Sequence, residues 1–129
     1  MHISELDTPV MLVDLTVLED NIRRLQMELT AAGINGRPHI KTHKIPAFGR
    51  KQIEAGAIGI CCQKVGEAEV FAMAGFDNIL IAFNIVGRPK VERLARLQHL
   101  QLVGLEGDRR VLHLDAVDFG RVGGARGDF

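Results

Sequence analysis

The residues between positions 37 and 44 combine side chains that could act on a carbonyl group. The stretch reads Arg-Pro-His-Ile-Lys-Thr-His-Lys, so Lys41 stands between His39 and His43. On an extended strand these three side chains would share one face. A partly buried lysine beside other basic groups can lose its proton and attack a carbonyl carbon to form a Schiff base. The alternative is an ordinary basic strand end that faces solvent or a phosphate.

Two prolines indicate where this stretch begins and ends. Pro38 suits the first position of a strand, where a missing N–H costs least, and Pro46 suits the first turn of a helix. Lys41 is therefore expected near the C-terminal end of a strand over 37–42. Ligands bind at that end of the strands in α/β proteins, so Lys41 is the main candidate for a site residue.

The other segments alternate between apolar runs and helical patterns. The run 10–15 predicts a buried strand, and Thr16 with Glu19 has capping-box spacing before a helix that ends at Gly33. Further strands are predicted at 57–63, 78–84 and 100–106, and further helices at 46–55, 65–74 and 89–98. This strict alternation predicts an α/β fold with parallel strands and right-handed crossovers.

Three segments of the chain resemble one enzyme family in register and in order. They are Asp-Thr-Pro at 7–9 followed by the run 10–14, the stretch 37–44, and Gly-Ala-Ile-Gly-Ile-Cys-Cys-Gln-Lys-Val-Gly-Glu-Ala-Glu at 56–69. The family is that of the D-threonine aldolases and D-serine dehydratases, which use pyridoxal phosphate, and the resemblance covers about residues 5 to 98. It implies an alanine-racemase type of fold, in which an N-terminal TIM-like barrel precedes a β-rich domain.

The resemblance also implies a role for the basic stretch. Lys41 is expected to bind pyridoxal phosphate covalently and to act as the catalytic lysine, with Lys44 as the weaker candidate. His39, His43 and Gln63 are expected to contact the cofactor or to tune the lysine. Gln63 is also placed there by its position at the end of a predicted strand.

Other polar residues are candidates by position and chemistry. Asn84 and Asp14 end predicted strands, but each could equally solvate a loop, and Asp14 could cap the following helix. Cys61 and Cys62 are neighbours, which rarely bridge each other, so both are expected to be reduced and to pack as small hydrophobic side chains.

No metal ligand is predicted. On a strand, His39 and His43 would lie on the order of 13 Å apart, too far to share one ion. The resemblance implies a divalent metal in full-length relatives, but its ligands would come from the C-terminal domain. That domain is expected to be absent from this chain.

The length of the chain limits the architecture. A (β/α)₈ barrel needs about 250 residues, and this chain has 129. We expect a partial barrel of four to five β/α units over 1–106, followed by an atypical Gly- and Arg-rich tail over 107–129 that is disordered. The chain would be either a truncated or frame-shifted product, or a half-barrel that dimerises to close its sheet.

The composition of the chain limits the classes of binding partner that we expect. Formal charge is zero, which favours neither nucleic acid nor an anionic membrane. With no apolar run of spanning length and no signal region, the protein is expected to be cytoplasmic. Exposed sheet edges would permit a homo-oligomer.

The expected function is that of a pyridoxal-phosphate-dependent lyase acting on D-amino acids. The D-threonine aldolase reaction splits a β-hydroxy-D-amino acid into glycine and an aldehyde. A D-serine dehydratase or an amino-acid racemase of the same fold remains an alternative, as does a non-catalytic cofactor-binding or partner-binding fragment. Weak or no activity is expected from this chain alone.

Overall fold

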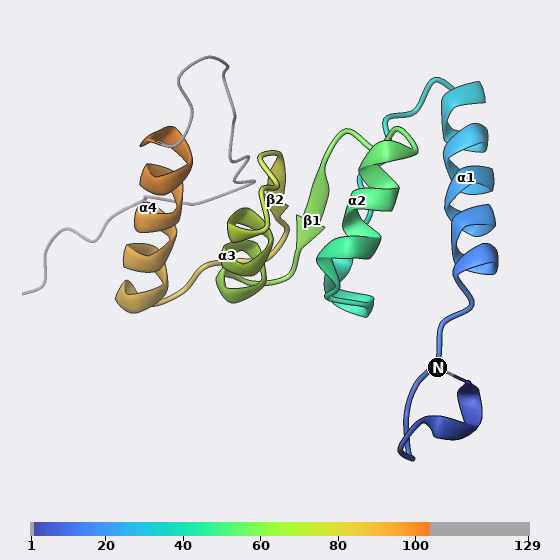
Figure 1. The fold of residues 1–129 in the computed structure, drawn as a ribbon. Helices are drawn as coiled ribbons and strands as arrows, with labels where there is room; N and C mark the ends of the chain where they lie inside the picture. Colours follow the sequence, from blue (N-terminus) through green and yellow to red (C-terminus); the bar gives the residue numbers. More distant parts are fainter. Residues whose placement is uncertain (1, 104–129) are drawn as a thin grey trace, which may run out of the picture.

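The computed structural model describes residues 2–103. Along the chain the elements are η1 (Ile3–Glu5), α1 (Leu15–Ala31), η2 (Ile40–Thr42), α2 (Pro46–Glu54), β1 (Ile60–Cys62), α3 (Val65–Met73), β2 (Ile79–Ile81) and α4 (Arg88–Val103). Figure 1 shows α1 at one side of the molecule, followed by α2, the sheet and, at the other side, α4. Helices and parallel strands together make this an α/β fold.

The sheet is small and parallel. Strands β1 and β2 pair with Ile60 opposite Ile79, and α3 forms the crossover between them. A parallel bridge joins His39 to Cys61, whose N–H donates to Pro38 O at 2.8 Å. The segment around His39 therefore runs parallel to β1 on the side away from β2. The C-terminal ends of all three segments lie together, at what we call the C-terminal edge of the sheet.

The hydrophobic core lies where this sheet meets α3 and α4. Phe71 of α3 is only 1% exposed and meets Phe76 edge to face, with ring centroids 5.1 Å apart. Helix α2 comes close to both rings because Gly49 has no side chain: a Cβ there would lie 2.9 Å from the Phe76 ring. The buried residues of the core are Ile40, Ile60, Cys62, Val65, Ala68, Phe71, Phe76, Ile79, Ile81, Leu94 and Leu97.

Two helices begin and end close to where the sequence predicted. Helix α2 starts with a proline and α3 follows β1 directly, and their bounds lie within one residue of the predicted 46–55 and 65–74. The helix predicted at 89–98 is longer, because α4 extends to Val103. The strand predicted at 100–106 is therefore wrong over 100–103. Its remainder and the tail at 107–129 lie outside the described residues.

Helix α1 is capped differently from the prediction. Asp14, not Thr16, is the N-cap, and its carboxylate accepts a hydrogen bond from the Val17 N–H at 3.1 Å. The capping box of Thr16 and Glu19 is therefore wrong. Aspartate is as good a cap as threonine, and its choice starts the helix two residues earlier.

Two predicted strands are wrong. Residues 10–14 form no strand, and the apolar side chains of this run are 48% to 91% exposed. A strand requires a hydrogen-bonded neighbour, and no described segment pairs with this one. The strand at 37–42 is reduced to the bridge at His39, after which the chain turns into η2. The strands predicted at 57–63 and 78–84 are confirmed in shortened form as β1 and β2.

Among residues 2–103, no helix has both the length and the apolar character needed to cross a membrane.

Candidate functional site

Lys41 lies in η2, immediately beyond the point where its segment leaves the sheet. Its side chain is exposed. Gln63 follows β1 at the same edge, and Ala82, which donates its N–H to Cys62 O at 3.1 Å, follows β2. The arrangement presents an accessible primary amine at the C-terminal edge of a parallel sheet, where α/β proteins bind ligands.

His39 links the backbone of Lys41 to the end of β1. The Lys41 N–H donates to His39 Nδ1 at 3.3 Å, and His39 Nε2 lies 3.2 Å from Gln63 Oε1. A backbone N–H can only donate, so Nδ1 accepts, and the ring hydrogen is assigned to Nε2, which donates to Gln63. The structure thus brings together three of the predicted site residues. The same bond to Nδ1 turns the chain out of the sheet, because a local side-chain acceptor competes with strand pairing.

His43 lies in a different environment from His39. Its ring packs against Phe48, with centroids 5.7 Å apart, and Nδ1 accepts the Ile45 N–H at 3.0 Å. The buried Nε2 makes no hydrogen bond of good geometry, and Gln52 is its polar neighbour. Burial lowers the pKa of His43, partly opposed by Gln52 and the Ile45 backbone. The predicted shared face of the two histidines is wrong, because the chain leaves the extended conformation after His39.

Glu67 is a site neighbour that the sequence predictions missed. This carboxyl side chain is 7% exposed; Oε2 accepts the Gln63 N–H at 2.8 Å, and Oε1 lies 3.6 Å from Lys44 Nζ. It stands in the first turn of α3, where the helix dipole favours an acid. The signal that could have found it is its place as an acid in the first turn of the helix predicted at 65–74.

The two cysteines are free and buried, as predicted. Burial raises the pKa of Cys61, an effect that the Ala82 backbone and the charges of Arg37 and Lys41 partly oppose. Burial, with the charge of Glu67, raises the pKa of Cys62 to about 12. Both thiols are therefore protonated near neutral pH and are poor nucleophiles.

Within residues 2–103, no hydrogen bond joins the remaining candidates to this cluster. Asp14 is occupied in capping α1, and Asn84 is exposed in the segment that follows β2. Within residues 2–103, no group of three or more His, Cys, Asp and Glu side chains is arranged to hold a metal ion.

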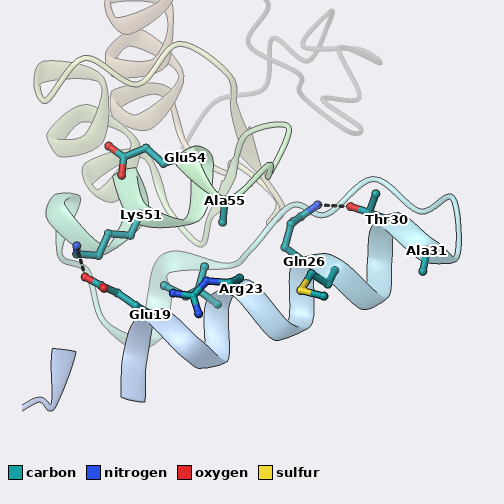
Figure 2. A pocket seen from close by; sticks show the side chains of 10 residues that line it. Glu19, Arg23, Gln26, Thr30, Ala31, Lys51, Glu54 and Ala55 are labelled. Carbon is teal, nitrogen blue, oxygen red and sulfur yellow. Dashed lines mark hydrogen bonds and ion pairs between the residues drawn. The ribbon is translucent and has the colours of Figure 1, made fainter. Parts of the chain in front are cut away.

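A cavity lined by residues of α1 and α2 lies away from Lys41. Figure 2 shows this cavity, of about 640 Å³, with the ion pair between Lys51 and Glu19 at one end (2.5 Å) and the hydrogen bond between Gln26 and Thr30 at the other. A second cavity, of about 310 Å³, is lined mainly by apolar residues of α1 and the segment 36–38. A third lies at the opposite edge of the sheet, around Gly59 and Asn78.

Comparison with known proteins gives consistent relatives, although no family model matches the chain. The chain is 37% identical over 103 residues to the D-threonine aldolase of an Arthrobacter species, which covers 80% of this chain and 27% of that protein. It is 41% identical over 98 residues to the 3-hydroxy-D-aspartate aldolase of Paracoccus denitrificans, covering 75% and 25%. The chain thus spans about a quarter of the length of these curated relatives.

Solved structures agree with the sequence relatives. The crystal structure of D-threonine aldolase from Filomicrobium marinum matches with a TM-score of 0.72 and 43% identity, over 74% of this chain and 26% of that one. D-threo-3-hydroxyaspartate dehydratase from Delftia sp. HT23 matches with a TM-score of 0.71 and 35% identity, over 74% and 25%. At these identities the likeness concerns sequence as well as fold.

The fold and the comparisons together place the chain in a class of α/β proteins. Its relatives in this class are D-amino-acid aldolases and dehydratases by name. Within it, the matched part of this chain is a homologue of one quarter of D-threonine aldolase and its relatives, in agreement with the resemblance found in the sequence.

Proposed function

We propose that this chain forms part of a pyridoxal-phosphate-dependent lyase that cleaves β-hydroxy-D-amino acids, and that Lys41 binds the cofactor. Its α/β units would be a segment of a (β/α)₈ barrel. The observation that carries the proposal is the exposed amine of Lys41 at the C-terminal edge of the sheet. This amine lies within a chain 37% identical to a D-threonine aldolase over 103 residues.

The residues present fit an aldehyde cofactor. A primary amine must be reachable to attack the aldehyde carbon, and the Lys41 side chain is exposed. His39 accepts a hydrogen bond from the Lys41 backbone and lies 3.2 Å from the Gln63 side chain, so both add polar atoms to this turn. In this proposal Lys41 holds the cofactor, while His39 and Gln63 line the site; His43, which packs against Phe48, supports the turn from behind.

The division of labour follows from these contacts. Bound pyridoxal phosphate supplies an electron sink for the carbanion that is left when a bond to the substrate Cα breaks. Lys41 Nζ would hold the cofactor at the C-terminal edge of the sheet. His39 holds the Lys41 backbone through Nδ1 and keeps its hydrogen on Nε2, so its ring is fixed at both nitrogens. The protein's contribution here is orientation of one amine.

Dehydration is the second candidate reaction. The 35% identity and TM-score of 0.71 to D-threo-3-hydroxyaspartate dehydratase favour it nearly as strongly as aldol cleavage. The two reactions act on the same kind of substrate, a D-amino acid with a hydroxyl on the β-carbon. Aldol cleavage releases glycine and an aldehyde, whereas elimination of water releases ammonia and a 2-oxo acid.

The test of Lys41 is chemical trapping. The chain is incubated with pyridoxal phosphate and reduced with borohydride, and the pyridoxyl group is located by peptide mass spectrometry. We expect one adduct per chain on Lys41, its loss in Lys41→Arg, and its retention in the matched control Lys44→Arg, which keeps the charge. Labelling scattered over many lysines, or equal labelling of Lys41→Arg, would overturn the proposal.

The reaction type is tested separately with D-threonine. Release of acetaldehyde and glycine supports an aldolase, and release of ammonia and 2-oxobutanoate supports a dehydratase. A chain that is labelled at Lys41 but releases neither product pair is a cofactor-binding segment without turnover. That result agrees with the weak or absent activity expected from this chain alone, and it leaves the cofactor assignment intact.

A further inference from the structure

The buried carboxylate of Glu67 closes a ring of contacts around the Lys41 turn. Going round, the Lys41 N–H donates to His39, His39 meets the Gln63 side chain, and the Gln63 N–H donates to Glu67. The ring closes at Lys44, whose Nζ lies 3.6 Å from Glu67 Oε1. The segment 39–44 therefore contacts the segment 63–67 at both ends of the turn, through His39 with Gln63 and through Lys44 with Glu67.

A carboxylate in this position is held by its partners. Only 7% of the Glu67 side chain is exposed, and a buried carboxylate is tolerated when it is hydrogen-bonded and paired. Its two oxygens have different partners, because Oε2 holds the backbone that follows β1 and Oε1 attracts the ammonium group of Lys44. Glu67 is therefore placed to act on the Lys41 segment from α3.

The backbone of Lys44 shows that the turn needs such support. Its φ of 53° lies in the left-handed region, which is unfavourable for a residue with a side chain unless the surroundings compensate. The Lys44 N–H donates to Ile40 O at 2.8 Å, which ends η2, and the ion pair with Glu67 holds the side chain. A strained residue at the end of the turn fixes where the preceding residues lie.

We infer that Glu67 is a positioning residue for Lys41, acting through Gln63 on one side of the turn and through Lys44 on the other. This inference rests on the proposed function in naming Lys41 as the group to be positioned. Glu67 itself need not touch cofactor or substrate. Its role is to keep the Lys41 amine at one place on the sheet edge.

The first test measures the turn directly, without cofactor. Amide hydrogen exchange is followed at Lys41, His43 and Lys44, with the core amide of Ile60, which donates to Asn78 O, as the reference for global opening. In Glu67→Ala both contacts are lost, and exchange in the turn should accelerate by about ten-fold or more. In Glu67→Gln one acceptor remains, and about two- to five-fold is expected from the lost ion pair.

The matched control is Glu69→Gln. It is the same substitution on the same helix and also removes an ion pair, but that pair joins α3 to Arg93 of α4. Exchange in the Lys41 turn should remain within about two-fold of the wild type. If Glu69→Gln and Glu67→Gln accelerate the turn equally, or if the Ile60 amide accelerates as much as the turn does, Glu67 stabilises the fold in general and the inference is wrong.

The route through Lys44 has its own test. Asparagine tolerates the left-handed conformation, so Lys44→Asn removes the ammonium group without disturbing the backbone. In a Glu67→Gln background this second substitution should add less than about two-fold to exchange, because the pair is already broken. Full additivity would mean that the two side chains act independently, which would contradict the route through Lys44.

The second readout is borohydride trapping of the pyridoxyl group. The share of label on Lys41 should fall in the order wild type, Glu67→Gln, Glu67→Ala, and should not change in Glu69→Gln. If the wild-type chain itself shows no preference for Lys41, the proposed cofactor role fails, and the exchange measurement still decides whether Glu67 holds the turn. If labelling of Lys41 is the same in Glu67→Ala as in the wild type, the positioning role is contradicted.

Discussion

The two ends of the described chain are built differently. Residues 39–97 surround a core in which the inward side chains of β1 and β2 are almost fully buried. Residues 2–31 contribute none of the buried side chains, and the apolar run before α1 is largely exposed. The candidate site belongs to the first region, since Lys41, Gln63 and Glu67 all lie on the edge of that core. Order at the site therefore depends on the sheet and α3 far more than on α1.

The largest expected effect is a difference in stability loss between two variants, each of which truncates one side chain in one of these regions. Phe71→Ala empties a site that is 1% exposed and breaks the edge-to-face contact with Phe76, so we expect a loss of about 3–5 kcal/mol in the free energy of unfolding. Leu25→Ala, on α1 and 58% exposed, should cost less than about 1 kcal/mol. Urea unfolding followed by circular dichroism measures both.

Equal losses in the two variants would contradict the comparison. They would mean that α1 is covered in solution as thoroughly as α3 is.

The next effect concerns the edge of the sheet opposite Lys41. Gly59 precedes β1, and a Cβ there would lie 2.3 Å from the Arg37 guanidinium and 2.5 Å from Asn78 O. The second atom is backbone that accepts hydrogen bonds from Ile60 at 2.9 Å and from Arg37 at 3.2 Å, so it cannot move freely. Gly59→Ala should cost about 1–3 kcal/mol by urea unfolding.

Gly66→Ala is the matched control, because it adds the same methyl group within α3. The nearest atom to a Cβ there is the end of the flexible Arg93 side chain, at 3.4 Å. Alanine also favours a helix over glycine by about 1 kcal/mol, so this variant should be neutral or more stable. An unaffected Gly59→Ala would show that the sheet edge is less tightly packed than its contacts indicate, and a destabilised Gly66→Ala would show that α3 has less room than its contacts indicate.

Sequence patterns predicted the elements whose signals are local. Pro46 at the start of α2 and the glycines Gly56 and Gly75, both with positive φ, bounded two helices correctly. The apolar run at 10–15 has the composition of a strand too, but composition does not supply the neighbour that a strand requires. The described elements provide none, so that prediction failed.

The same contrast between local signals and tertiary contacts holds for the residues of the candidate site. The type and spacing of His39 and Lys41 were informative in the sequence, but their arrangement depends on one hydrogen bond from a backbone N–H to an imidazole nitrogen. Glu67 was missed as a site residue because its contact with the Lys41 turn is tertiary: Lys44 lies more than twenty positions earlier, whereas Gln63 is a local partner. A pattern that assumes regular alternation cannot register either contact.

The smallest effect concerns His43, a partly buried residue of the region 39–97. Burial lowers the pKa of His43 from its ordinary value of 6.5, so the folded protein resists a proton that the unfolded chain accepts. The stability that this group contributes is present above pH 6.5 and is lost as the pH falls through that value toward the folded pKa. His43 is only partly buried, and the change should be smaller than that of Gly59→Ala.

Urea midpoints measured from about pH 8 down to about pH 5 give this pH dependence, since histidine is the side chain that ordinarily titrates in that interval. His43→Asn should flatten the decline, whereas His99→Asn, on an exposed position of α4, should leave it unchanged. A stability that rises as the pH falls would mean that the folded state favours the charged ring. The space between His43, Phe48 and Gln52 would then be open to water, and this turn would lie outside the buried core.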